Sequence, residues 1–342
     1  MVKAKYWTIN EKPVGLPKLN DFVLIEEELP EVKDGEIIMQ AEYLSVDPYM
    51  RYRLRQMNCG EPITGSQIAK VISSKNKEFP VGTYVVGYPG WRSHTLLSEK
   101  QLSQANEMGF PYMKLPDLGN VPKSTGLGIL GMPGNTAYFG LLEICEPKKG
   151  ETVLVNGAAG AVGSAVCQIA KIKGCNVIAF AGSDEKVSWL KDVIGIKNSF
   201  NYKTADIREV IKEAAPNGIN CYFDNVGGEF TATVLPLMAD FSRISVCGAI
   251  STYNDESKNT GSLFLNSPFH EGTIIWKQLK IEGFIVTKWL NRWMEGINQL
   301  KKWIEEGKLK YQETVTKGFE NTPKAFIELF DGKNNGKAIV EV

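Results

Sequence analysis

The segment of the sequence best suited to bind a charged ligand is a glycine-rich turn between an apolar run and a helical segment. Val153–Val155 precede the turn Asn156–Gly163, in which Gly160 and Gly163 carry the motif. Such a turn lets backbone N–H groups at a helix N-terminus approach a pyrophosphate. Tight turns also need glycine for steric reasons alone. A second apolar strand, Asn176–Ala181, completes the βαβ unit, so the motif predicts a dinucleotide site.

The end of the second strand indicates which dinucleotide binds. NAD enzymes place an Asp or Glu there to bind the ribose hydroxyls, but this sequence has Gly182 and Ser183. Asp184 and Glu185 fall at the start of the next helix, where acids commonly serve the helix dipole. Lys186 is then placed to meet a ribose phosphate, although a solvated surface lysine is the plain alternative. The pattern favours NADP.

The elements around this turn alternate between strand and helix. Such alternation predicts a doubly wound parallel sheet covered by helices, and hence an α/β fold. The expected strands and helices are 152–156, 161–173, 176–181, 184–193, 220–225, 228–238 and 243–248. Further on, apolar residues spaced by three and four predict an amphipathic helix with a buried face, through Trp289, Trp293, Ile297, Leu300 and Ile304.

The N-terminal third of the chain has a different texture. Short apolar runs separated by Pro and Gly turns predict a small β-rich domain from Asp21 to about Asp117. A glycine-rich connector, 124–136, leads into the alternating region. The final segment, with a helix at 323–330 and a strand at 336–342, is expected to fold back onto the N-terminal domain.

Composition excludes several classes of partner. Lys plus Arg equals Asp plus Glu at 39 each, so no global field draws in nucleic acid or an anionic membrane. The most apolar region, Thr125–Leu142, is interrupted by glycines and Pro133 and does not predict a membrane span. Met1–Asn10 has no signal-peptide pattern. We therefore expect a cytoplasmic protein without nucleic-acid or membrane partners.

The sequence contains no recognisable set of metal ligands. Its six cysteines lie far apart without a C-x-x-C pair, and its two histidines, His94 and His270, are isolated. The cysteines are expected to be reduced, buried thiols. Zinc dehydrogenases need clustered Cys and His ligands, so we predict no bound metal.

Several segments together resemble the prostaglandin and alkenal reductase family, zinc-free members of the medium-chain dehydrogenase/reductase superfamily, over essentially the whole chain. The matching segments are Val46–Arg51, Gly131–Gly134, Thr136–Gly140, Ala158–Gly163, Gly182–Lys186, Phe223–Gly228, Cys247–Asn254, Asn334 and Gly336–Lys337. Gly65-Ser66-Gln67 and Ser257–Thr273 depart from the family pattern, and both departures bear on the substrate entrance.

The resemblance implies a GroES-like catalytic domain, residues 1–125 completed by 310–342, and a Rossmann domain, residues 126–309. It implies a homodimer that uses NADP(H) to reduce the carbon–carbon double bond of α,β-unsaturated ketones and aldehydes. Small hydrophobic or lipid enones, such as 15-oxo-prostaglandins and alkenals, are the implied substrates, with oxidation of the leukotriene B4 12-hydroxyl as a further activity.

The resemblance also assigns site residues. Lys186 and Tyr202 would hold the 2′-phosphate, and Tyr49 and Met132 would line the substrate pocket. The cofactor would be bound by Gly160, Ala161, Val162, Gly163, Lys186, Tyr202, Asn225, Cys247, Gly248, Ala249, Ile250, Ser251, Thr252, Phe284, Ile285, Val286 and Asn334.

The chemical step needs a group that stabilises an enolate. Negative charge builds on the carbonyl oxygen as hydride reaches the β-carbon, and without a metal a neutral hydrogen-bond donor must meet it. The resemblance brings Tyr253 beside the nicotinamide ribose, on a loop beyond a strand's carboxyl end. A tyrosine in such a loop can instead only pack or order a ribose. Two other functions stay open: a quinone reductase, which would not need Tyr253, and a non-catalytic NADPH-binding protein.

Overall fold

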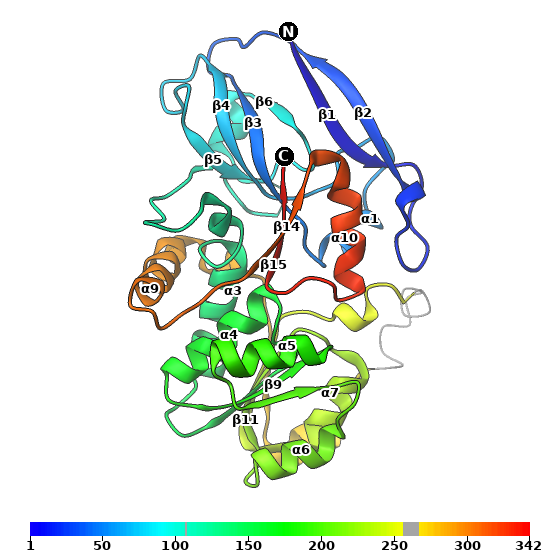
Figure 1. The fold of residues 1–342 in the computed structure, drawn as a ribbon, viewed down its shortest axis with the longest axis vertical. Coiled ribbons are helices and arrows are strands. Elements are labelled where there is room, and N and C mark those ends of the chain that lie inside the picture. The colour runs from blue at the N-terminus through cyan, green and yellow to red at the C-terminus, as the bar shows by residue number, and fades with distance from the viewer. Residues whose placement is uncertain (107, 256–266) are drawn as a thin grey trace. The chain divides into compact units, whose positions relative to one another are not determined.

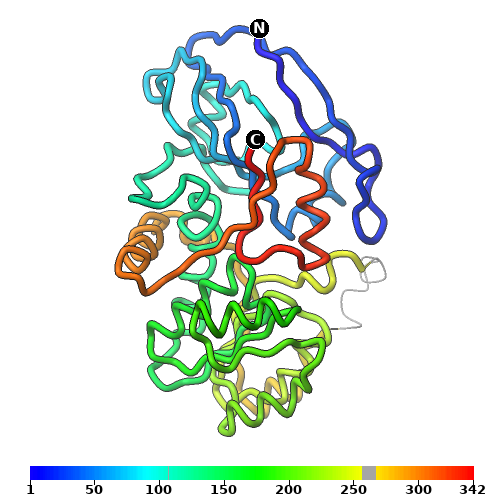
Figure 2. Tube along the Cα trace, in the orientation of Figure 1, coloured from blue at the N-terminus to red at the C-terminus, as the bar shows by residue number. Residues whose placement is uncertain are grey.

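The computed structural model describes residues 1–106, 108–255 and 267–342, and the chain divides into two compact units (Figures 1 and 2). Unit 1 comprises Met1–Gly128, Glu313–Asn334 and Ala338–Val342, and unit 2 comprises Ile129–Gln312 and Asn335–Lys337. The colour ramp in Figure 2 follows the chain from unit 1 through unit 2 and back to unit 1.

Unit 1 is built on antiparallel strands. In the described part of the chain its main sheet has the order β14-β15-β3-β4-β5-β7, with β6 also paired to β3, and β1 and β2 form a separate ribbon. The strands are β1 (Val2–Ile9), β2 (Phe22–Leu29), β3 (Ile37–Ser45), β4 (Gln67–Ser74), β5 (Tyr84–Gly87), β6 (His94–Leu97), β7 (Met113–Lys114), β14 (Glu313–Lys317) and β15 (Lys337–Glu341).

The helices of unit 1 are short and cover a compact apolar core. They are α1 (Met50–Leu54), α2 (Glu99–Ser103), α10 (Thr322–Phe330) and the 3₁₀ segments Leu19–Asp21, Lys123–Leu127 and Phe319–Asn321. Trp91 and Phe326 are fully buried and meet edge to face at 5.6 Å between ring centroids. The C-terminal strand β15 pairs with β3, with Ile339 opposite Ser45. The two chain ends of unit 1 therefore share one core.

Unit 2 contains a wholly parallel sheet in the order β10-β9-β8-β11-β12-β13. Its central strand β8 is buried along its whole length, as expected for a parallel strand covered on both faces. The strands are β8 (Thr152–Val155), β9 (Asn176–Ala181), β10 (Asn198–Asn201), β11 (Ile219–Asp224), β12 (Met238–Val246) and β13 (Lys280–Gly283).

The helices of unit 2 connect these strands, and Figure 1 shows α4 and α5 crossing in front of the sheet. They are α3 (Met132–Phe139), α4 (Ala161–Ile172), α5 (Asp184–Ser188), α6 (Ile207–Ala214), α7 (Gly228–Val234), α8 (Glu271–Lys277) and α9 (Trp293–Glu305). Single π turns follow α3 and α5, at Gly140–Cys145 and Trp189–Ile194, and 3₁₀ segments lie at Leu235–Leu237, Ile250–Thr252 and Val286–Arg292. The α/β fold predicted from the sequence is confirmed.

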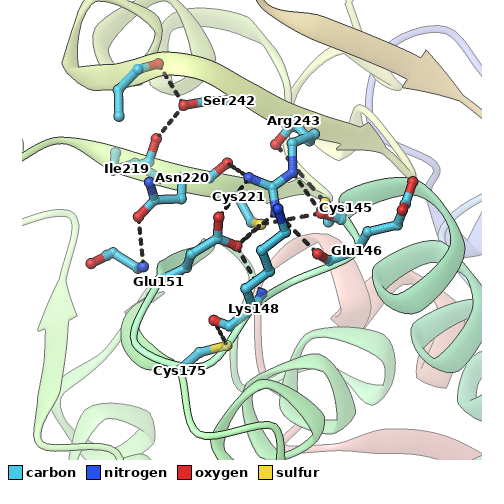
Figure 3. A network of polar contacts seen from close by, with 12 residues as sticks. Cys145, Glu146, Lys148, Glu151, Cys175, Ile219, Asn220, Cys221, Ser242 and Arg243 are labelled. Carbon is cyan, nitrogen blue, oxygen red and sulfur yellow. Dashed lines mark hydrogen bonds and ion pairs between the residues drawn. The ribbon is translucent and has the colours of Figure 1, made fainter.

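A partly buried ion pair lies near the amino-terminal edge of this sheet (Figure 3). The Arg243 guanidinium of β12 donates to both carboxylate oxygens of Glu151, at 2.6 and 3.0 Å, in the bidentate geometry that arginine favours. Its Nε also donates to the Cys145 carbonyl at 2.7 Å. Glu151 directly precedes β8, so these contacts tie two strands at the edge opposite the glycine turn.

Some predicted elements were wrong in extent. The β-rich region was predicted to start at Asp21, yet Val2–Ile9 also forms a strand, which pairs along its length with β2. The single helix through Trp289 was also wrong, because Trp289 has non-helical dihedral angles and α9 starts at Trp293. The helix expected at 228–238 ends at Val234, and Met238 already belongs to β12.

Candidate active site

The expected cofactor residues of unit 2 gather at one edge of the parallel sheet. Because the strands run in the same direction, their carboxyl ends meet at that edge, where open α/β sheets bind ligands. The residues that follow β8 to β13 there are Gly160–Gly163, Lys186, Tyr202, Asn225, Cys247–Thr252 and Phe284–Val286. The sheet order reverses between β8 and β11, so the loops after β8, β9 and β10 lie on one side of this switch point and Asn225, after β11, lies on the other.

The glycine turn leaves no room for larger residues. Gly157 has φ +56°, and the N–H of Gly160 donates to the Gly157 carbonyl at 3.0 Å. A Cβ at Gly163 would lie 2.3 Å from that same carbonyl oxygen. The turn thus brings backbone close to the start of α4, whose first N–H groups lack helical partners and suit a phosphate. The residues present fit a bound dinucleotide.

A buried hydrogen-bond network holds the two sides of the switch point together. The Asn156 amide donates to the Asp224 carboxylate at 2.8 Å and to the Tyr222 hydroxyl at 2.6 Å. The Asn225 N–H donates to the Asn156 side-chain oxygen at 2.7 Å, and the Asn225 amide donates to the Asn156 carbonyl at 2.8 Å. Asn225 is therefore held in a fixed orientation.

Asp224 completes this network as an acceptor. Its carboxylate accepts from Thr231 Oγ1 at 2.6 Å and from the N–H groups of Val226 and Gly227 at 3.0 and 2.8 Å. Sequence reasoning did not select Asn156, Asp224 or Thr231 as functional, although the Asp-Asn-Val-Gly-Gly motif contains the signal. They act by holding Asn225 and the following turn.

The ends of β9 and β10 form the expected phosphate-recognition edge. The Tyr202 N–H donates to the Ala181 carbonyl at 3.1 Å, and the Tyr202 ring lies across Gly182, where an added Cβ would be 3.2 Å from Cε1. Ser183 caps α5, because its Oγ accepts from the Lys186 N–H at 3.4 Å. Burial and the neighbouring Lys203 lower the pKa of Lys186. A cationic, partly desolvated edge results.

The loop after β12 folds back on itself, so that the Tyr253 hydroxyl lies beside the first residues of the same loop. The Ala249 N–H donates to the Tyr253 hydroxyl at 3.3 Å, and a Cβ at Gly248 would be 3.2 Å from that oxygen. Burial raises the pKa of Tyr253, so the phenol keeps its proton at neutral pH. Burial likewise raises the pKa of Cys247 to about 12, which leaves a neutral thiol.

The remaining predicted residues of unit 2 differ in surroundings. The ring of Phe284 is partly buried and packs edge to face on Phe223 and Trp289, which fixes its position just after β13. Ile285 is 72 % exposed, whereas Val286 is buried. Met132 starts α3 and its carbonyl accepts from Thr136 Oγ1 at 2.7 Å.

Tyr49 and Asn334 belong to unit 1. The Tyr49 hydroxyl is buried and has no hydrogen-bond partner among the described residues. Burial, Tyr88 and Asp47 raise the pKa of Tyr49, so its phenol stays neutral. Burial also raises the pKa of Tyr88, and a hydrogen bond with Ser66 opposes that rise. The unexpected Ser66 thus contacts a phenol that the sequence did not single out.

Of the stretch Ser257–Thr273, residues 257–266 lie outside the described residues.

No group of three potential metal ligands occurs within residues 1–106, 108–255 and 267–342. Cys145 and Cys221 are fully buried, and the Cys221 thiol donates to the Cys145 carbonyl at 3.5 Å. Cys59 is exposed, so the expectation that all six thiols are buried was wrong. Over the same residues, no helix is both long and apolar enough to cross a membrane.

Comparison with known proteins defines the class. Residues 5–105 match the family model described as the N-terminal domain of oxidoreductase, and residues 161–302 match the one described as zinc-binding dehydrogenase. The protein belongs to the medium-chain dehydrogenase/reductase superfamily, in the branch of the prostaglandin and alkenal reductases.

Relatives within that branch match the chain from end to end. It is 48% identical to prostaglandin reductase 1 of Bos taurus, with 100% of both chains covered. It is 39% identical to the NADP⁺-dependent 2-alkenal reductase of Nicotiana tabacum, covering 100% of this chain and 98% of that protein. The crystal structure of CurA from Vibrio vulnificus in complex with NADPH superimposes with a TM-score of 0.87 at 36% identity, covering 99% of each chain. These relatives support NADP(H) as the cofactor.

Proposed function

We propose that this protein uses NADPH to reduce the carbon–carbon double bond of α,β-unsaturated ketones and aldehydes. The observation that carries the proposal is a neutral, partly buried phenol, Tyr253, on the loop after β12, at the same sheet edge as the glycine turn. The end-to-end similarity to prostaglandin and alkenal reductases supports it.

The cofactor would lie along the carboxyl edge of unit 2. Backbone N–H groups of Gly160–Gly163 would bind the pyrophosphate, and Lys186 with Tyr202 would bind the 2′-phosphate. Asn225, the loop 247–252 and the backbone of 284–286 would contact the nicotinamide half, and Asn334 is a further proposed contact. When bound, NADPH supplies the hydride that reduces the double bond.

The residues of the chain would stabilise the charge that develops on the substrate. As the β-carbon accepts hydride, the carbonyl oxygen gains negative charge and needs a donor at hydrogen-bond distance. Because Tyr253 keeps its proton, its hydroxyl can donate to that oxygen and later deliver a proton to the α-carbon. A ribose hydroxyl of the cofactor would share the task.

The substrate is proposed to be a small hydrophobic or lipid enone. Met132 and Tyr49 are the proposed pocket residues. Met132 is apolar, and the buried Tyr49 hydroxyl, which has no hydrogen-bond partner among the described residues, would be available to a polar group of the substrate. Residues 1–125 with 310–342 would supply the substrate-binding domain, and residues 126–309 the cofactor domain.

The decisive experiment follows NADPH consumption spectroscopically against enones, quinones and secondary alcohols. We expect turnover with enones, with the product saturated between the α- and β-carbons and the carbonyl retained. Faster turnover of quinones than of enones would favour the quinone reductase. No steady NADPH oxidation with any substrate would leave the non-catalytic binding protein.

We also propose that the protein is a cytoplasmic homodimer. Among the described strands, β13 lies at an edge of the parallel sheet, so its outer side would be available to pair with a second copy. Trp276 and Ile275 in the preceding helix are 85 % and 70 % exposed, and Ile285 is 72 % exposed. Light scattering should give twice the chain mass, and Ile275→Glu should shift it toward the monomer; an unchanged mass in this variant would place the interface elsewhere.

A further inference from the structure

We propose that Lys203 is a second binding residue for the 2′-phosphate, acting with Lys186 across the ends of β9 and β10. This inference rests on the proposed NADPH site and adds a residue to it. It gives the site two cations for a group that carries about two negative charges.

The first support is the position of Lys203 in the sheet. Strands β9 and β10 are parallel, and their last pair is Asn201 opposite Ala181. Lys203 lies two residues after the end of β10, and Ser183 lies two residues after the end of β9. Lys203 therefore leaves the sheet at the same edge as the cap of α5, next to Tyr202, whose ring covers Gly182.

The second support is a local brace that fixes the turn bearing Lys203. The Asn201 side-chain oxygen accepts from the Lys203 N–H at 3.1 Å, and the Asn201 amide donates to the Asp184 carboxylate at 2.8 Å. The Asn201 carbonyl also accepts from the Ala205 N–H at 2.9 Å. Asn201 thus binds the turn to Asp184, the first residue of α5, through one oxygen of its carboxylate.

The third support is electrostatic. Lys203 is exposed and makes no ion pair with any residue that the structure describes. The negative charge of Glu185 acts on Lys186 instead and raises its pKa. Burial lowers the pKa of Lys186, and repulsion by the positive charge of Lys203 lowers it further. Two ammonium groups held near one another gain most from a dianion placed between them. A phosphomonoester has that charge, whereas the ribose hydroxyl of NADH does not.

Binding of nucleotide fragments tests this without any turnover. Calorimetry on the full chain should show that Lys203→Ala weakens 2′,5′-ADP by about ten-fold and leaves 5′-AMP within about two-fold. Lys203→Arg should keep most of the affinity. Lys197→Ala is the matched control, because Lys197 is an exposed lysine beside the opposite end of β10, and it should bind both fragments like the unchanged protein.

The outcomes separate this inference from the wider proposal. Unchanged 2′,5′-ADP affinity in Lys203→Ala, with a loss in Lys186→Ala, would overturn the role of Lys203 alone. If the unchanged protein binds 2′,5′-ADP no better than 5′-AMP, the whole 2′-phosphate site is wrong. Equal weakening of both fragments in Lys203→Ala would mean a general loss of structure and would also overturn the inference.

Discussion

At the scale of single residues, we expect the chemistry to depend most on the hydroxyl of Tyr253. Tyr253→Phe removes the donor and keeps the ring, so we expect the turnover number to fall by about ten- to a hundred-fold. NADPH affinity should change little, and stopped-flow absorbance with cofactor titration measures both. Turnover equal to that of the unchanged enzyme would assign proton delivery to a ribose hydroxyl or to water.

We expect cofactor preference to depend on Lys186. Lys186→Ala should raise the Michaelis constant for NADPH by about ten-fold or more, because a charge-assisted hydrogen bond is lost. The constant for NADH should stay nearly unchanged. Lys191→Ala, at an exposed lysine of the same region, serves as control. Equal effects of Lys186→Ala on both cofactors would show that Lys186 does not recognise the phosphate.

Some of these residues could be predicted from the sequence and others could not. Gly163 and Lys186 follow from spacing, because the phosphate turn and the end of the second strand are local features of a βαβ unit. Asp224 and Asn156 lie 68 residues apart, and their contact depends on β8 and β11 being neighbours. The order of strands is a tertiary property, so no local pattern contains it.

At the scale of elements, a buried polar side chain in α3, which packs on α9, lowers the stability of the fold. Asn135 in α3 is 0 % exposed, and neither polar atom of its side chain has a hydrogen-bond partner among the described residues. A buried group in that state costs about 1–3 kcal/mol. Asn135→Leu keeps the branched shape and the number of side-chain heavy atoms and removes the polar atoms, so it should raise the free energy of unfolding by about that amount in urea titration.

Gln168 in α4 provides the matched control. It is also buried, but its amide donates to the Lys310 carbonyl at 2.8 Å and its oxygen accepts from the Lys310 N–H at 2.7 Å. Gln168→Leu should therefore destabilise the protein. A loss of stability in Asn135→Leu comparable to that in Gln168→Leu would contradict our account of Asn135.

The errors in predicted elements have physical causes. Strand β1 carries Lys3 and Lys5 among apolar residues, and β2 contains three successive glutamates, 26–28. Each strand alone is therefore a weak signal, and pairing becomes favourable only once the partner strand is present. The segment around Trp289 has helical spacing, but Trp289 itself stacks on Phe139 with ring centroids 5.4 Å apart, and its backbone is non-helical there. Tertiary packing outweighed local periodicity at both places.

At the scale of the whole molecule, the chain's ligand chemistry predicts independence from metal. A strong chelator should leave enone reduction at its full rate, because no clustered Cys and His ligands exist in the sequence to hold a catalytic ion. Elemental analysis of purified protein should find no stoichiometric metal. Activity lost on chelation and restored by zinc would refute this.

The seam between β8 and β11 also sets how the cofactor should act on the protein's motions. Three residue pairs of the β8–β11 ladder join the two halves of the sheet there, together with the hydrogen bonds between Asn156 and Tyr222, Asp224 and Asn225 and the Glu151–Arg243 ion pair. A dinucleotide bound across the switch point would span both halves. A bound dinucleotide would therefore stabilise the closed sheet, because β8 and β11 could separate only after the ligand had dissociated. Hydrogen–deuterium exchange of the β8 and β11 amides should slow in proportion to NADPH concentration above its Kd, while exchange in the β1–β2 ribbon stays constant.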